Sequence, residues 1–269
     1  MTRSDADKPL PITIELVGGL GNQLFQYGAG LAQAQRLSTD LILNIGRLKP
    51  SQSRSFELAE LAPFATTKRP SKLYLRRFGE SGFAYDQRVD QVRPGTFMRG
   101  YFQSWKYLTE IGGRLKDEFQ QSTASTPVVT EPHIALQVRR GDYLNPQTLK
   151  VHGICSFDYF ERSLKFARSK LGNLPAVVFG DDAQTAADFA GKLQNALVDQ
   201  SPENSSALET LHQLSFATAH IISNSSFGWW GSWLSPHSRM TIAPRPWFSD
   251  NRLDTKDLLP TNWITFDRI

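Results

Sequence analysis

The stretch ITIELVGGLGNQLFQ, near the start of the chain, limits the fold more than any other feature of the sequence. A short apolar run over residues 12–17 predicts a buried strand, GGLGN predicts a turn, and residues 23–37 have a broad apolar helix face. A second apolar run, DLILNI at 40–45, predicts another strand. Strand, turn, helix and strand form a βαβ unit, which places the chain in the α/β class with parallel sheets covered by helices.

The second half of the sequence shows the same alternation, whereas residues 46–95 have poor periodicity and are expected to hold short helices and loops. The Ser-, Thr- and Pro-rich segment 120–132 predicts a linker between two α/β domains, whose cleft would suit a small ligand. Strands are expected at 133–138, 176–182, 220–224 and 240–244, and helices at 156–171, 183–193, 207–219 and 226–234. The expected organisation is a flexible tail at 1–9, an N-terminal α/β domain at 10–125 and a C-terminal α/β domain at 126–269.

The composition narrows the class of protein. A net charge of +4 suits an anionic small ligand, an anionic membrane surface or nucleic acid, but no RNA-binding signature surrounds the short basic clusters, so no nucleic-acid partner is expected. One cysteine, Cys155, fits a reducing compartment. The polar N-terminus does not resemble a signal peptide, and no apolar run approaches the roughly 20 residues of a membrane helix. We expect a cytoplasmic protein, with peripheral contact at the inner face of the membrane as an open alternative.

Two adjacent arginines, Arg139 and Arg140, follow the predicted strand in HIALQVRRGDY. Ligands of open α/β sheets bind at the carboxyl ends of strands, and the planar fork of arginine matches phosphate oxygens. Adjacent strand residues point to opposite faces, so both side chains can contact one ligand only where the chain turns, as Gly141 permits. A structural salt bridge is the better interpretation for one arginine, and a diphosphate ligand for the pair.

The glycine turn GGLGNQL does not predict a dinucleotide site, because Leu24 occupies the position of the third glycine and Asp40 opens the second strand. A tight packing turn and a ligand contact are about equally supported. Asn22 and Gln23 favour the ligand contact slightly, because exposed amide groups at a helix N-terminus favour an anion.

Two further strand ends carry polar residues. In FGDD we assign Asp181 to ligand binding and Asp182 to capping of the next helix; a metal-bridging pair would need further acidic ligands nearby. In SNSSFGWWGSWL, Asn224, Ser225 and Ser226 stand where a strand passes into a helix, which suits phosphate or ribose. The nearby tryptophans at helical spacing and the histidine before them are expected in the core: Trp229, Trp230, Trp233 and His220.

These segments together resemble bacterial α-1,2-fucosyltransferases of glycosyltransferase family 11. The similarity spans residues 12–248, and several blocks in the family's order are more specific than any one of them. The matching blocks are GGLGNQLFQY, GYFQSWKY, VRRGDY, FGDD, SNSSFGWWGSWL and IAPRPWF.

The resemblance implies a GT-B-like fold of two facing Rossmann-like domains with mainly parallel sheets, in which the C-terminal domain binds most of GDP-fucose. It implies inverting transfer of fucose to the 2-hydroxyl of a terminal galactose, on an oligosaccharide or a lipid-linked glycan, with no metal and no cofactor beyond the donor substrate. Arg139 would be the catalytic contact to the diphosphate, and Asp181 would hydrogen-bond guanine. Gly21, Asn22, Arg140, Asn224, Ser225, Ser226 and Phe227 would complete the donor site.

One position departs from the family pattern: Gln137 stands where the motif has histidine. Glutamine cannot titrate near neutral pH, so we interpret residue 137 as a positioning group. Asp142 is a candidate base that ranks below a structural role. The alternatives are another nucleotide-sugar transferase on the same scaffold, or a catalytically inactive protein that binds a glycan or a nucleotide.

Overall fold

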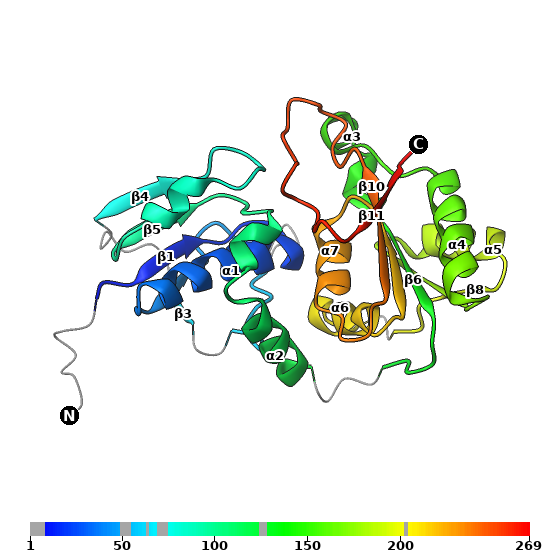
Figure 1. The fold of residues 1–269 in the computed structure, drawn as a ribbon, viewed down its shortest axis with the longest axis horizontal. Coiled ribbons are helices and arrows are strands. Elements are labelled where there is room, and N and C mark those ends of the chain that lie inside the picture. The colour runs from blue at the N-terminus through cyan, green and yellow to red at the C-terminus, as the bar shows by residue number, and fades with distance from the viewer. Residues whose placement is uncertain (1–8, 49–54, 63–64, 69–74, 124–127, 202–203) are drawn as a thin grey trace. The chain divides into compact units, whose positions relative to one another are not determined.

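The computed structural model describes residues 9–48, 55–62, 65–68, 75–123, 128–201 and 204–269 (Figure 1). The chain divides into two compact units. Unit 1 runs to Ser122 and also includes Asp254–Leu258, whereas unit 2 consists of Thr123–Leu253 and Leu259–Ile269. The sequence had suggested a boundary between residues 125 and 126 and no return of the chain. Residues 1–8 of the expected tail and 124–127 of the expected linker lie outside the described residues.

Unit 1 contains a five-stranded parallel sheet in the order β3-β2-β1-β5-β4. Its helix α1 lies close on the sheet because Gly30 has no side chain; a Cβ there would lie 2.8 Å from Leu41 Cδ1 and 3.0 Å from Ile14 Cγ2. The elements are β1 (Ile12–Glu15), α1 (Leu20–Arg36), β2 (Leu41–Asn44), β3 (Thr66–Lys68), β4 (Arg76–Gly79), η3 (Gln87–Gln91), β5 (Thr96–Arg99), η4 (Trp105–Leu108) and α2 (Gly112–Ser122).

The short return segment of the chain is tied to unit 1 through Asp257. Its carboxylate accepts a hydrogen bond from the backbone N of Tyr85 (3.2 Å) and pairs with Lys106 Nζ at 2.6 Å. Its carbonyl oxygen accepts from Ser104 Oγ at 2.8 Å. Three contacts from one residue explain why this late segment belongs to the first unit.

Unit 2 contains a six-stranded parallel sheet in the order β11-β10-β9-β6-β7-β8. Helices α4 and α5 cover one face of the sheet and α6 and α7 the other (Figure 1). The elements are β6 (Ile134–Val138), η5 (Gly141–Leu144), α3 (Pro146–His152), α4 (Phe157–Leu171), β7 (Ala176–Gly180), α5 (Ala183–Lys192), β8 (Ala196–Val198), α6 (Ala207–Ser215), β9 (Ala219–Ile222), α7 (Ser226–Trp233), β10 (Met240–Arg245) and β11 (Ile264–Asp267).

The local sequence explains these elements. All five residues of β6 are buried, as expected of a central parallel strand that helices cover on both faces. Side chains cap the helix starts: Ser156 accepts from Tyr159 N at α4, and Ser206 forms a capping box with Glu209 at α6.

The α/β class with two Rossmann-like units is confirmed, and every described strand pairing is parallel. The sequence missed several elements, namely β3, β4, β5, β8, β11, α2 and α3. β4 is exposed at three of its four positions and carries Arg76 and Arg77, so its pattern is not that of a buried strand. Among the described residues, no helix combines the length and apolar character needed to cross a membrane.

Candidate functional site

The sheet of unit 2 reverses its winding between β6 and β9. From β6 the chain proceeds to β7 and β8 on one side, while β9, β10 and β11 extend on the other. Gln137 and Ile222 are register partners across this junction. At such a switch point the connections leave in opposite directions, which opens a crevice at the carboxyl ends of the strands. Arg139 follows β6 directly at this edge, and Ser223 follows β9.

Arg139 is held on two sides. Its Nη1 atom pairs with Asp181 Oδ2 at 3.0 Å, and its guanidinium carbon lies 5.4 Å from the ring centroid of Tyr143. The arginine side chain is 26% exposed and the aspartate side chain 19%, so the pair is ordered yet accessible to a ligand. Sequence reasoning missed Tyr143, although it is the last residue of the VRRGDY block.

Asp181 is itself fixed by the loop after β6. Its Oδ1 atom accepts a hydrogen bond from the backbone N of Arg140 at 2.8 Å. A Cβ on Gly141 would collide with Oδ2 of the same carboxylate. Glycine is therefore needed at position 141 because the Asp181 carboxylate lies against its Cα. It is not needed for backbone conformation, since Gly141 does not have a positive φ. The carboxylate expected to hydrogen-bond guanine thus also aligns Arg139.

The side chain of Arg140 binds two backbone carbonyl oxygens. Its Nη1 donates to the carbonyl oxygen of Arg139 (2.9 Å) and its Nη2 to that of Cys155 (2.7 Å). Its guanidinium carbon lies 5.2 Å from the ring centroid of Phe189, and burial lowers the pKa of Arg140. Arg140 therefore braces the loop through these carbonyl oxygens, and its expected contact with a diphosphate stays a prediction.

Asn224 supports the neighbouring loops. Its side chain is buried, and Nδ2 lies within hydrogen-bond distance of the carbonyl oxygens of His152 (2.8 Å), Gly153 (3.2 Å) and Trp247 (3.0 Å). Its own carbonyl oxygen accepts from Tyr143 Oη at 3.1 Å. Asn224 therefore links the loop after α3, the loop after β10 and the tyrosine beside Arg139.

The N-terminus of α7 lies at the same sheet edge. Ser225 is its extended N-cap residue, and within the described part of the chain its side chain makes no capping hydrogen bond. Ser226 and Phe227, which open the helix, are partly exposed, and the first turn contains no acidic residue. The unpaired amide groups of a helix N-terminus and its dipole favour a bound anion.

Gln137, the departure from the family pattern, lies behind this helix start. It is buried, and its Oε1 accepts from Ser223 Oγ at 2.7 Å. A Cβ on Gly228 would come within 2.6 Å of that oxygen, so the helix packs directly on the glutamine. Gln137 joins the ends of β6 and β9 and the start of α7, as a positioning group would.

Trp229, Trp230 and His220 are confirmed as core residues and Asp182 as a cap, whereas Trp233 is only partly buried. Trp229 and Trp230 are fully buried, and the rings of Trp229 and Trp233 stack with centroids 5.7 Å apart. Both ring nitrogens of His220 are bonded, to Ser238 Oγ (3.0 Å) and to a backbone carbonyl, and burial lowers its pKa to about 4. Asp182 caps α5 by accepting from Thr185 N at 2.7 Å.

Gly21 and Asn22 belong to the first turn of α1, so the expectation that they are turn residues is wrong. The turn is made by Gly18, whose φ is +81° and whose missing Cβ leaves room for the Asn22 amide. Asn22 Oδ1 accepts from Gln103 Nε2 at 2.8 Å. This contact joins the GGLGNQ and GYFQSWKY blocks within unit 1, which sequence reasoning did not foresee.

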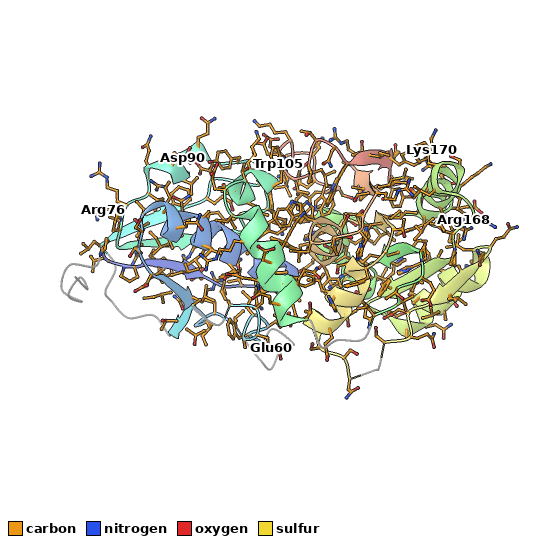
Figure 2. All side chains as sticks on the ribbon, turned by 60° about the horizontal axis from the view of Figure 1, so that its bottom comes forward. Glu60, Arg76, Asp90, Trp105, Arg168 and Lys170 are labelled. Carbon is orange, nitrogen blue, oxygen red and sulfur yellow. The ribbon has the colours of Figure 1, made fainter. Side chains whose placement is uncertain are left out.

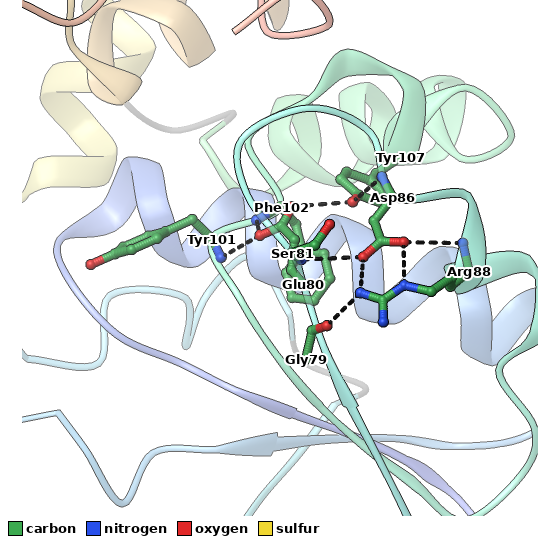
Figure 3. A network of polar contacts seen from close by, with 8 residues as sticks. All are labelled: Gly79, Glu80, Ser81, Asp86, Arg88, Tyr101, Phe102 and Tyr107. Atoms are coloured by element: carbon green, nitrogen blue, oxygen red, sulfur yellow. Dashed lines mark hydrogen bonds and ion pairs between the residues drawn. The ribbon is translucent and has the colours of Figure 1, made fainter. Parts of the chain in front are cut away.

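A partly buried carboxylate, Glu80, holds the loop after β5 (Figure 3). Its Oε2 accepts from the backbone N atoms of Tyr101 and Phe102, both at 2.8 Å, and its Oε1 from Tyr107 Oη at 3.1 Å. Burial raises the pKa of Glu80 to about 7, and the three donors limit that rise. The clamp fixes the backbone immediately before Gln103.

A second carboxylate, Asp86, completes this network (Figure 3). Its backbone N donates to Tyr107 Oη at 2.9 Å, and Arg88 pairs with its carboxylate at 2.5 Å. Hydrogen bonds from Arg88 hold the pKa of Asp86 at about 2. The neighbouring carboxyl groups therefore have opposite shifts, because one is desolvated and the other has a cationic partner.

The described residues contain no group of three or more His, Cys, Asp or Glu side chains able to hold a metal ion. The side chain of Asp142 lies outside the described part of the structure.

Comparisons with known proteins bear on the whole chain. The family model Glycosyl transferase family 11 matches residues 2–267. Two Escherichia coli proteins are each 27% identical: an alpha-1,2-colitosyltransferase, over 96% of this chain and 99% of its own, and the O-antigen biosynthesis glycosyltransferase WbnK, over 93% and 98%. Among solved structures, the alpha-1,6-fucosyltransferase NodZ from Bradyrhizobium, soaked with GDP-fucose, aligns with 84% of this chain and 93% of its own, at a TM-score of 0.47 and 14% identity.

Proposed function

Because this chain belongs to glycosyl transferase family 11, we propose that it transfers fucose from GDP-fucose to the 2-hydroxyl of a terminal galactose on a glycan acceptor. The observation that carries the proposal is the convergence at one sheet edge of Arg139, held by Asp181, and the N-terminus of α7. A permanent cation and a helix start at the same sheet edge suit a diphosphate.

The chemistry needs stabilisation of a leaving group. As the bond to fucose breaks, negative charge builds on the diphosphate, while the sugar becomes oxocarbenium-like. Arg139 would meet that charge from one side, and the amide groups of α7 from the other, without reorganising, because Asp181 and Tyr143 already hold the arginine. Ser225, Ser226 and Phe227 would line the nucleotide.

The proposal includes transfer without a metal ion. Both oxygens of Asp181 already accept hydrogen bonds, from Arg139 and from the backbone of Arg140, and Asp182 caps α5. A divalent cation would have to displace these contacts and would lack the further acidic ligands that it normally uses. The charge that a cation would bring to the diphosphate is supplied by Arg139.

The test is transfer from GDP-fucose to lactose by the purified full-length chain, with release of GDP as one readout and the product as the other. The expected product has an α-linked fucose on the 2-hydroxyl of galactose, which proton NMR identifies and which requires inversion of the β-linked donor. Arg139→Lys is the matched variant, because it keeps the charge and loses the fork. Release of GDP without formation of fucosylated lactose would reject the proposed transfer. A product in which fucose is linked to another hydroxyl would reject the assigned acceptor position.

A second candidate donor is favoured by the similarity to an alpha-1,2-colitosyltransferase. The same assay with a GDP-linked colitose beside GDP-fucose distinguishes the two donors by kcat/KM. A parallel set of assays uses lipid-linked glycans as acceptors in place of lactose, because the relative WbnK is named for O-antigen biosynthesis. A higher kcat/KM for the colitose donor would replace fucose in the proposal and leave the site unchanged.

A further inference from the structure

Unit 1 has a cavity at the carboxyl edge of its sheet that the proposed donor site does not use. The strands β1, β2, β4 and β5 end there at Glu15, Asn44, Gly79 and Arg99, and the cavity encloses about 420 Å³. Glu15 is the register partner of Asn44, and Gly79 that of Arg99. Side chains alternate along a strand, and Ile14 faces α1, so these residues lie on the face of the sheet opposite α1.

The cavity has more positive charge than its own carboxylate can balance. Glu15 is buried, and Arg99 pairs with it through Nε (2.9 Å) and Nη2 (3.1 Å). Arg47 adds a contact at 3.3 Å, and Arg77 is a third lining arginine. Neutralising one buried carboxylate requires one of these guanidinium groups. The side chains of Arg47 and Arg99 are 61% and 62% exposed, so they present charge to a ligand.

Asn44 gives this cavity a second and independent sign of a ligand. The residue is only 4% exposed, and its Oδ1 accepts from Gly46 N at 2.9 Å. Its Nδ2 group has no acceptor among the residues that the structure describes. Because this nitrogen is not fully enclosed by protein atoms, it can donate to a ligand in the cavity that Asn44 lines.

We propose that this cavity binds an oxyanion, a carboxylate or a phosphate, carried by a saccharide. The proposal rests on the proposed function for the choice of a saccharide as the carrier. Arg47, Arg77 and Arg99 would bind the oxygens, and the Asn44 amide would donate to one of them. Phe97 supplies the apolar wall that ligand cavities combine with a few polar groups.

Direct binding tests the cavity without requiring transfer. Galactose, glucuronate and galactose 1-phosphate are titrated separately into the full-length protein by ligand-observed NMR, with GDP at saturation so that the donor site is filled. The two anionic sugars distinguish a carboxylated glycan from a phosphate at the end of a saccharide. We expect at least one of them to bind roughly tenfold or more tightly than galactose, since a charge-assisted hydrogen bond accounts for about that factor.

The variants are Arg47→Gln and Arg77→Gln. Each is expected to weaken the binding of the anionic sugar by roughly tenfold. Both leave the paired Glu15 and Arg99 intact, so the fold is retained. The matched control is Arg76→Gln: Arg76 is the exposed neighbour of Arg77 on β4, lies on the other face of the sheet, and projects from the surface of unit 1 (Figure 2). Binding by the control should equal that of the wild type.

Three results would overturn the proposal. Equal affinity for galactose and for both anionic sugars would show that the cavity does not recognise an oxyanion. Equal loss in the Arg76 control would show a general charge effect. Weaker GDP binding in the Arg47 or Arg77 variant would make the cavity part of the donor site. Failure of transfer with unchanged anion binding would contradict the proposed function alone and leave the cavity a binding site.

Discussion

Glu80 should make the free energy of unfolding fall between pH 5 and pH 8, and one substitution at this position should remove that contribution. Its folded-state pKa is about 7, against 4.5 for an ordinary glutamate. The folded state therefore binds the extra proton between these values, so the stabilisation is fully present below the unfolded pKa and is lost as the pH rises through about 7. Linkage over this window gives a loss of about 2.5 kcal/mol in the free energy of unfolding between pH 5 and pH 8.

Glu80→Gln should abolish that contribution. The glutamine oxygen can still accept from the backbone N atoms of Tyr101 and Phe102, so the loop after β5 keeps its main clamp. Urea unfolding followed by tryptophan fluorescence, at several pH values from 5 to 8, gives the difference between variant and wild type. The wild type should lose about 2.5 kcal/mol relative to the variant across this range. Other titrating groups, His220 among them, cancel in this difference.

Glu161→Gln is the matched control, because Glu161 is an exposed carboxylate on α4. Its pH profile should run parallel to that of the wild type. Parallel profiles for Glu80→Gln as well would refute the reasoning, since they would show that the three hydrogen bonds keep Glu80 ionised as readily in the folded chain as in water. A profile that diverges in the opposite direction would mean that these hydrogen bonds outweigh burial.

Four further outcomes are expected. Arg139→Lys should lower kcat by roughly 10²–10³ with an unchanged melting temperature, and near-normal turnover would remove this arginine from the mechanism. Asp181→Ala should raise the Kd for GDP about tenfold in calorimetry, because Arg139 loses its aligning partner; a proportional loss for guanosine would assign guanine recognition to the same carboxylate. Dialysis against EDTA should leave transfer intact, whereas loss on chelation and recovery with Mn²⁺ or Mg²⁺ would contradict the metal-free proposal. Gly228→Ala should destabilise by about 1–3 kcal/mol, because its methyl group meets Gln137 Oε1, and an unchanged urea midpoint would show that α7 can shift.

Sequence reasoning worked best where burial is continuous. The strands β6, β7 and β9 are short apolar runs that end at polar residues, and the helices after β7 and β9 have Asp182 and Ser225 at their N-cap positions, so both pattern and boundary were visible. It failed for β4, whose RRFG sequence has the composition of a loop and which is a strand because β5 pairs with it. Pairing of this kind depends on tertiary context and leaves no periodic signal.

The candidate site divides in the same way. The positions of Arg139 and Asp181 followed from strand ends, since carboxyl ends of parallel strands meet at one edge. Their contact, and the turning of Arg140 towards the backbone carbonyls, depends on side-chain directions that a one-dimensional pattern does not contain. The clamp at Glu80 could not be predicted either, because its three donors come from residues 21, 22 and 27 positions later.

The return of Asp254–Leu258 to unit 1 imposes an order on biosynthesis. A ribosome must complete nearly all of unit 2 before Asp257 emerges to bind Tyr85, Ser104 and Lys106. During synthesis of the second half, the first half of the nascent chain therefore lacks the contacts that Asp257 makes in the finished protein. Splitting the gene at the junction near residue 123 would separate unit 1 from Asp254–Leu258, whereas the second half would keep all of unit 2. A circular permutant that opens elsewhere would keep unit 1 and this segment on one polypeptide.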